Sequence, residues 1–352
     1  MFGWLFMHPV ANCVTHPQVI FNVFHPSNMD YLLLFVGLGL LLLAANYLVD
    51  ASVAIAQRAK ISNFIIGLTI VGIGTSAPEL FVSISSALKN SGDIAMGNVI
   101  GSNIANILLI LGVTAMIFPF DIERLQRRRD IPFMIIATLF VTLIANDTIL
   151  PGFTSNSLNR LDGIVLLVAF VAYMGWVIVQ KGKDPKKALE DADEEATSSL
   201  TGKNPWLLWA IAVVSLVALI YGGNLFLDSA KNLARAWGMS EAVIAITIVA
   251  VGTSLPELVT AVFAASKKNP QLALGNVIGS NLFNLMFILG TASTVKPLTF
   301  IDINIWDYAV MFVATIMLYM VVFTFKKDKM DRIEGVIFFV AYVGYTIYLL
   351  MR

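Results

Sequence analysis

The sequence predicts an all-α membrane protein, and three observations support this class. Of the 352 residues, 58% are hydrophobic and 13% are charged, whereas soluble domains average about 45–50% and about 25%. Long apolar stretches alternate with short polar loops along the chain. A polar motif inside these stretches also occurs twice. The composition therefore excludes an ordinary soluble enzyme.

Ten stretches are long and apolar enough to cross, as helices, a bilayer core about 30 Å thick. They cover residues 31–49, 64–88, 94–118, 131–146, 163–180, 205–227, 242–265, 272–295, 308–325 and 333–351. The fourth stretch is the shortest. We expect ten transmembrane helices, with ends accurate to several residues.

The distribution of basic residues predicts how the chain is oriented. Cytoplasmic loops carry an excess of Lys and Arg, and alternate loops here hold 17 and 6 of the 23 basic residues. We therefore expect an integral multi-pass protein of the plasma (inner) membrane with both termini extracytoplasmic. The apolar spans make the lipid bilayer an expected partner. The charges of the 23 basic and 23 acidic residues cancel, so nucleic acid is not an expected partner. No obligate protein partner is indicated, which is compatible with a monomer.

Residues 1–30 are expected to form an extracytoplasmic extension. This segment holds the only cysteine, Cys13, and the three histidines His8, His16 and His25, each followed by proline. X-Pro steps favour an extended chain and no ligand pair has helical spacing, so a soft-metal site is the less favoured interpretation.

The remaining chain divides into a first five-helix repeat, a cytoplasmic connector and a second five-helix repeat, at residues 31–180, 181–204 and 205–352. The connector contains an acidic run at 190–195. A solvated linker explains this run better than a calcium sensor, because the glycine and twelve-position ligand spacing of an EF-hand are missing.

An internal duplication relates the two repeats. A shift of 178 residues aligns GTSAPEL (74–80) with GTSLPEL (252–258) and superimposes two identical GNVIGSN segments (97–103 and 275–281). Between 74–112 and 252–290, 20 of 39 positions are identical. Five spans separate equivalent points, so the second copy crosses the membrane in the opposite sense. Inverted repeats of this kind are typical of secondary transporters with substrate sites near the midplane.

Two carboxylates occupy matching positions well inside apolar spans, namely Glu79 and Glu257. A charged side chain at the bilayer centre costs at least about 2.5–3.5 kcal/mol. No Lys, Arg or His lies in the central part of any predicted span, so a salt bridge cannot offset this cost. Either both acids are protonated, or a bound cation is their partner.

The neighbouring residues favour a cation. Each glutamate follows a proline, which interrupts helical hydrogen bonding, and oxygen-bearing side chains surround both positions. In the following spans, Asn98, Ser102 and Asn106, and likewise Asn276, Ser280 and Asn284, recur every four residues on one helical face. Each feature alone has a structural explanation, such as a kink, helix packing or a local hydrogen bond. The duplicated set predicts an oxygen-rich cage suited to Ca²⁺ or Na⁺.

These motifs resemble the two signature α-repeats of the calcium/cation antiporter superfamily, specifically its prokaryotic sodium/calcium exchangers. The resemblance covers about residues 31–351, with the motifs at 72–112 and 250–290. It implies an ion transporter rather than an enzyme, with transported Ca²⁺ and Na⁺ as substrates, no resident cofactor and discontinuous helices at the ion site.

The resemblance also implies a set of ion ligands, with Glu79 and Glu257 as the main ones. Hydroxyl oxygens, the backbone carbonyls near Gly72 and Ala250, and two asparagines complete the set: Thr75, Ser76, Ser102, Thr253, Ser254, Ser280, Asn106 and Asn284. Potassium-dependent relatives carry Asp where this chain has Asn284, so potassium coupling is not expected.

The sequence therefore predicts a Na⁺/Ca²⁺ antiporter that works by alternating access. The main alternative is a proton/calcium (or other divalent cation) exchanger, since a proton can also neutralise a carboxylate. The hydroxyl-rich flanks favour Na⁺, because a proton would not need them. A passive channel and an intramembrane hydrolase with paired carboxylates are less favoured, because the repeat is typical of transporters and no substrate groove is indicated.

Overall fold

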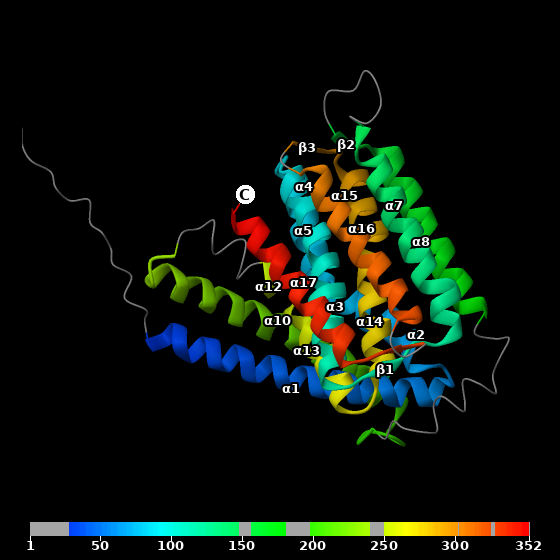
Figure 1. The fold of residues 1–352 in the computed structure, drawn as a ribbon. Coiled ribbons are helices and arrows are strands. Elements are labelled where there is room, and N and C mark those ends of the chain that lie inside the picture. The colour runs from blue at the N-terminus through cyan, green and yellow to red at the C-terminus, as the bar shows by residue number, and fades with distance from the viewer. Residues whose placement is uncertain are drawn as a thin grey trace, which may run out of the picture.

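The computed structural model describes residues 28–147, 156–180, 198–239, 250–301, 303–324 and 328–351. These residues form a helical bundle with short strands at its ends (Figure 1). The N-terminal His and Cys residues and the acidic run of the connector lie outside the described residues.

The first half begins with a long helix, α1 (Asn28–Ala59). A broken segment follows, made of α2 (Asn63–Ile66), the π-helical turn η1 (Gly67–Val71), α3 (Gly72–Thr75) and α4 (Ala77–Leu88). The half then continues through α5 (Gly92–Ile104), η2 (Ala105–Leu111), α6 (Gly112–Ile117), β1 (Phe120–Asp121), η3 (Gln126–Asp130), α7 (Ile131–Ile144), β2 (Asn156–Leu158) and α8 (Arg160–Gln180).

The second half repeats the main helices and strands in the same order, with differently placed short turns. It begins with the long helix α10 (Pro205–Ala236), followed by α12 (Ala250–Gly252) and α13 (Leu255–Ser266). The remaining elements are α14 (Pro270–Leu282), η7 (Phe283–Ile288), α15 (Leu289–Val295), β3 (Leu298–Phe300), α16 (Ile305–Met320), η8 (Val321–Phe323), β4 (Lys329–Met330) and α17 (Arg332–Met351).

Helix occupies part or all of each predicted span. By length and composition, six helices of the described chain could cross a membrane, or seven if the bent segment 63–88 is one span. Two shorter apolar helices, α13 and α16, accompany them. The structure is thus an all-α, membrane-type fold.

The helices α1 and α10 extend past their predicted ends at residues 49 and 227. Asp50 and Asp228 ended the apolar stretches, but neither residue ends its helix. Asp50 is buried and its Oδ1 lies 2.7 Å from Lys267 Nζ. Asp228 is exposed and pairs with Lys231, three residues further along α10. A charge that is paired or solvated therefore does not stop a helix.

Contacts between the halves recur in equivalent pairs. Strand β1 pairs with β4, and β2 pairs with β3, both antiparallel, and the two pairs lie at opposite ends of the bundle (Figure 1). Helix α8 of the first half packs against α15 of the second, and α17 packs against α6 of the first. Two glycines face each other at each crossing, Gly163 with Gly290 and Gly112 with Gly335. Each half therefore completes the packing of the other.

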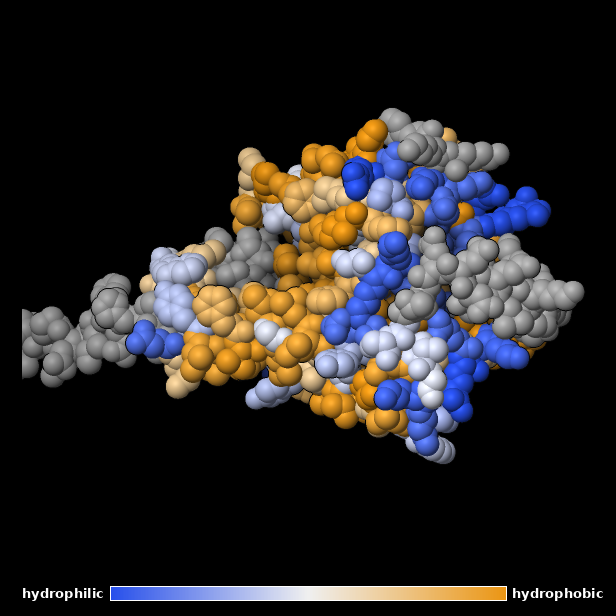
Figure 2. All heavy atoms as spheres, turned by 90° about the horizontal axis from the view of Figure 1, so that it is seen from below, coloured by the Kyte–Doolittle hydropathy of each residue, from blue (hydrophilic) through white to orange (hydrophobic). Residues whose placement is uncertain are grey.

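The core and the outer surface are both apolar. The segments α5–α6 and α14–α15 are largely buried, whereas α8, α10 and α17 expose large apolar side chains such as Val168 and Val340. The helices α1 and α10 run side by side at a steep tilt to the others (Figure 1). Figure 2, seen from the β1 end, shows hydrophilic residues over the bundle and hydrophobic ones over the projecting helices. An apolar outside is what a surface in contact with lipid requires.

Candidate ion-binding site

Two helices are interrupted at the same position of the duplicated motif. In the first half, α3 and α4 meet at Ser76, and the segments 63–75 and 77–88 are bent by 45°. In the second half, α12 and α13 meet at Thr253 and Ser254. A new helix therefore begins in the interior of the bundle at each of the two breaks.

Each new helix begins with a proline and a glutamate. Pro78 and Pro256 lie in the first turn, where the missing N–H of proline has no helical partner to lose. Glu79 and Glu257 follow in the same turns. The positive end of the helix dipole favours a carboxylate at such a position.

The two glutamates are buried, each 1% exposed. Ser76 Oγ, from the first half, donates to Glu257 Oε1 of the second half at 2.9 Å. Ser102 Oγ donates to Glu79 Oε1 at 3.5 Å. Since Ser76 lies three residues before Glu79, these bonds bring the two interrupted turns together.

Each carboxylate retains one oxygen without a partner in the part of the chain that the structure describes. Glu79 Oε2 and Glu257 Oε2 are buried and accept no hydrogen bond from the described residues, and Ser254 Oγ is in the same situation. Two ionised carboxylates in such an interior would repel each other. None of the ion pairs found among the described residues includes either glutamate. A buried carboxylate needs a counter-charge, and a bound cation would supply it.

Hydroxyl and carbonyl oxygens line the first break. Ser280 Oγ donates to the backbone oxygen of Gly72 at 3.1 Å, and Thr75 Oγ1 lies 3.5 Å from the same oxygen. Thr75 Oγ1 also donates to Asn276 Oδ1 at 3.2 Å. These contacts join the interrupted helix of the first half to α14 of the second.

Asn98 and Asn276 anchor the two glutamate turns in equivalent ways. Asn98 Nδ2 donates to the backbone oxygen of Glu79 at 3.2 Å, and Asn276 Nδ2 donates to that of Glu257 at 3.4 Å. These carbonyls belong to the first turns after the breaks. The asparagines of the repeated motif thus hold the turns, while the carboxylates remain available to an ion.

Sequence reasoning missed Asn103 and Asn281, the last residues of the two GNVIGSN segments. Their Oδ1 atoms accept hydrogen bonds from Asn284 at 3.1 Å and Asn106 at 3.3 Å. Their repetition in an identical motif was a usable signal. The four-residue spacing that selected Ser102 and Ser280 did not include Asn103 and Asn281, which follow them directly in the sequence.

The structure brings most of the predicted site residues together. The contacts above join Glu79, Glu257, Thr75, Ser76, Ser102, Ser280 and Gly72. Asn106 and Asn284 meet the opposite half through Asn281 and Asn103, and each keeps a buried Oδ1 without a partner among the described residues. Ser254 is buried, Thr253 is half-buried, and Ala250 begins α12.

The donor atoms are of one chemical kind. Among the described residues, no three His, Cys, Asp or Glu side chains gather as a transition-metal site would require. The cluster instead offers carboxylate, hydroxyl, amide and backbone oxygens, the ligands that hard cations prefer. Its chemistry therefore suits Ca²⁺ or Na⁺.

Comparisons with known proteins give the same class. The family described as "Sodium/calcium exchanger protein" matches residues 29–179 and 207–351. The sodium/calcium exchanger MaX1 of Methanosarcina acetivorans is 31% identical over 91% of this chain and 98% of its own. The inner membrane protein YrbG of Escherichia coli is 35% identical over 75% of this chain and 79% of its own. A solved structure of the sodium-calcium exchanger NCX_Mj superimposes with a TM-score of 0.75 at 30% identity, covering 91% of this chain and 98% of that one.

The fold and these matches define a membrane transporter rather than an enzyme. The chain belongs to the sodium/calcium exchanger family. The resemblance inferred from the two repeated motifs is thereby confirmed.

Proposed function

We propose that the protein is a secondary active antiporter that exchanges Na⁺ for Ca²⁺ across the plasma (inner) membrane. The ions compete for one site near the midplane, built on Glu79 and Glu257. The observation that carries this proposal is a pair of buried carboxylates, one from each half, that each keep an oxygen without a partner among the described residues.

Charge balance explains why exchange is obligatory. Two carboxylates carry about −2, which one Ca²⁺ or two Na⁺ would neutralise, and the surrounding hydroxyl and amide oxygens could hold a further Na⁺. An empty site would leave two like charges in a poorly hydrated interior. Movement between the two open states is then slow until ions are bound, so ions exchange rather than leak.

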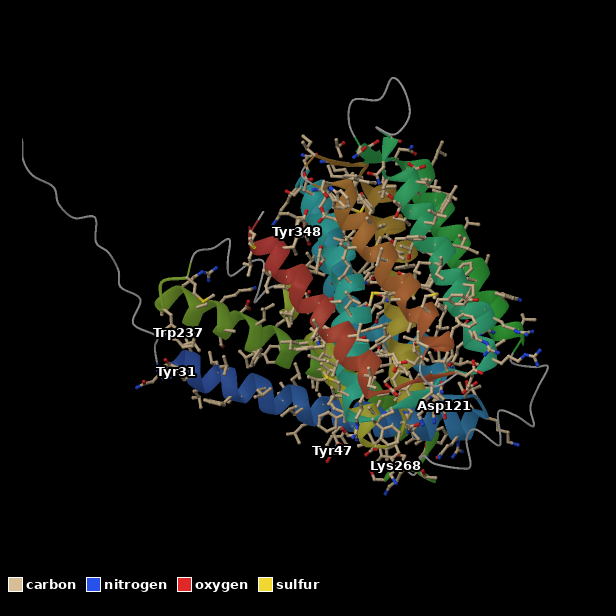
Figure 3. The ribbon with its side chains drawn as sticks, viewed as in Figure 1. Tyr31, Tyr47, Asp121, Trp237, Lys268 and Tyr348 are labelled. Carbon is tan, nitrogen blue, oxygen red and sulfur yellow. The ribbon has the colours of Figure 1, made fainter. Side chains whose placement is uncertain are left out.

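The two halves are proposed to be inverted five-helix repeats, which together make ten transmembrane helices. The equivalent strand pairs at opposite ends of the bundle support an axis in the membrane plane. In Figure 3, Asp121 and Lys268 lie at the end where most basic residues are expected, and Tyr348 lies far from them. The exposed aromatic residues Tyr348 and Trp237 suit the opposite, extracytoplasmic interface.

Ion flux measurements test the function directly. Purified protein in sealed liposomes loaded with Na⁺ should take up ⁴⁵Ca²⁺ when the outside is free of Na⁺. Equal K⁺ or H⁺ gradients, each imposed alone, should give only background uptake. Uptake driven by the pH gradient in the absence of Na⁺ would instead establish the proton/calcium exchanger, which is the second candidate because a proton also neutralises a carboxylate. Ca²⁺ entry without any counter-ion would indicate a channel.

Alternating access requires the two halves to hold different contacts in each open state, and one ion pair differs between the two repeats in this structure. Asp50 on α1 is joined to Lys267 at the end of α13, at 2.7 Å, and accepts from Ser199 Oγ at 2.9 Å. The repeat equivalent of Asp50 is Asp228, whose side chain is 70% exposed and pairs within its own helix. The equivalent of Lys267 is Lys89, at the end of α4. An Asp228–Lys89 pair is therefore expected in the opposite state.

Replacing Lys267 by Gln should weaken the present state. Hydrogen–deuterium exchange in the C-terminal half of α1 should rise severalfold, because Asp50 loses its ion pair and α1 loses an anchor on α13. The neighbouring exposed Lys268 provides the control, and Lys268→Gln should leave exchange unchanged. Equal exchange in the two variants would contradict a state-specific role for the pair.

A further inference from the structure

Four asparagines form a hydrogen-bonded network across the contact between the two halves. Asn106 Nδ2 donates to Asn281 Oδ1 at 3.3 Å, and Asn284 Nδ2 donates to Asn103 Oδ1 at 3.1 Å. The 178-residue shift converts each bond into the other. All four side chains are at most 1% exposed. The same pair of hydrogen-bonded asparagines thus occurs twice, and each pair joins the two halves.

The hydrogen bonds of Asn103 and Asn281 determine whether each side chain offers its Oδ1 or its Nδ2 to the asparagine of the other half. Asn103 uses its Nδ2 on the backbone oxygen of Asn281 at 3.4 Å, which leaves its Oδ1 to accept. Asn281 Nδ2 points to Met134 Sδ at 3.7 Å, which leaves its Oδ1 to accept. Both residues therefore present an acceptor, and an amide that meets an acceptor must offer its NH₂ group.

This arrangement determines the orientation of Asn106 and Asn284. Their NH₂ groups are turned toward Asn281 and Asn103, so their Oδ1 atoms point away from the network. Both Oδ1 atoms are buried without a partner among the described residues. The turn η2, which contains Asn106, packs against α13 of Glu257, and η7, which contains Asn284, packs against α4 of Glu79. The unpaired oxygens therefore belong to segments that border the two glutamates.

We propose that Asn103 and Asn281 are positioning residues that hold the amides of Asn284 and Asn106 with oxygen toward the transported cation. This inference rests on the function proposed above, because it takes that cluster as the ion site. A side-chain amide attracts a cation through its oxygen and repels it through its NH₂ group. Without the fixed acceptors, either amide could rotate by half a turn and present the wrong atom.

Double-mutant cycles test the proposal. Asn103→Leu removes the acceptor while roughly preserving volume, and Asn284→Ala removes the amide that it orients. Each single variant should raise the apparent KM for Ca²⁺ about tenfold, the order expected for one polar contact to a charged group. If Asn103 acts through Asn284, the double variant should be no worse than Asn284→Ala alone. Thermal unfolding measured in parallel reports folding separately from ion affinity.

The other half provides the matched control. Combining Asn103→Leu with Asn106→Ala should come closer to the product of the two single effects than the Asn103–Asn284 pair does, because Asn103 contacts Asn284 directly and is linked to Asn106 only through the backbone of Asn281. The Asn281→Leu and Asn106→Ala pair should be non-additive in turn, which provides a second test if Asn103→Leu does not fold. The proposal would be overturned by additive effects in both the Asn103–Asn284 and the Asn281–Asn106 cycles. A loss of stability with unchanged KM would also overturn it.

Equilibrium ⁴⁵Ca²⁺ binding to the purified protein separates this inference from the proposed function. If wild-type protein binds Ca²⁺ but does not exchange it for Na⁺, the proposed coupling fails, and the same cycles measured as the Kd of Ca²⁺ binding still decide the positioning role. If Glu257→Gln weakens binding but Asn284→Ala does not, the site assignment survives and the positioning role is refuted.

Discussion

Glu257→Gln should abolish Na⁺-driven Ca²⁺ uptake while leaving the protein folded. The substitution keeps the shape of the side chain but removes one of the two charges that balance Ca²⁺. Removing one partner of a buried charge pair costs about 3–5 kcal/mol, which corresponds to a loss of more than about a hundredfold in affinity. The substitution also removes one of two like charges from the buried interior, so thermal unfolding should not occur at a lower temperature.

Two further variants complete this experiment. Glu79→Gln should have the same effect, since the two acids occupy equivalent positions. Asp121→Asn is the control, because it also removes one carboxylate, but from a side chain that is 77% exposed. Liposome uptake of ⁴⁵Ca²⁺ measures all three. Wild-type transport by Glu257→Gln would refute the site assignment.

Gly279→Ala should strongly reduce stability, because the main chain of η1 lies against α14 there. A Cβ at Gly279 would lie 2.3 Å from the backbone oxygen of Leu68, and one at Gly275 would lie 2.2 Å from that of Phe64. Neither oxygen can move without moving its helix. Overpacking usually costs about 1–3 kcal/mol, and a contact with backbone belongs at the upper end of that range. A lower unfolding temperature of the purified protein would show the effect.

An exposed glycine on α8 provides the control. A Cβ at Gly175 would meet no atom of the described residues within 4 Å. Gly175→Ala should therefore unfold close to the wild-type temperature. If Gly175→Ala is as unstable as Gly279→Ala, the close approach of η1 to α14 does not set the requirement for glycine.

The sequence predicted the helices because hydropathy depends on local composition, but it misplaced ends that depend on distant partners. Asp50 ended the first apolar stretch, although its partner Lys267 lies 217 residues further along the chain. The pairing of an acid with a base from another segment is not visible in a window of neighbouring residues. The length of α1 therefore became clear only from the structure.

The candidate site shows the same division. Glu79 and Glu257 could be selected from the sequence because each is a costly residue at a repeated position. Asn103 could not be selected by helical spacing, because its role depends on contact with Asn284 of the other half. The π-helical turns that begin at Ala105 and Phe283 also change the spacing on which a continuous helical face would rely.

The exchange of α8 and α17 between the halves has a consequence for how the fold is completed. Each half supplies the helix that covers α6 or α15 of the other, with glycines at both crossings. A single half would leave that surface uncovered, whereas two halves packed together cover it in both at once. If the halves are inverted repeats, as proposed above, the packing is that of an antiparallel pair of similar units joined in one chain.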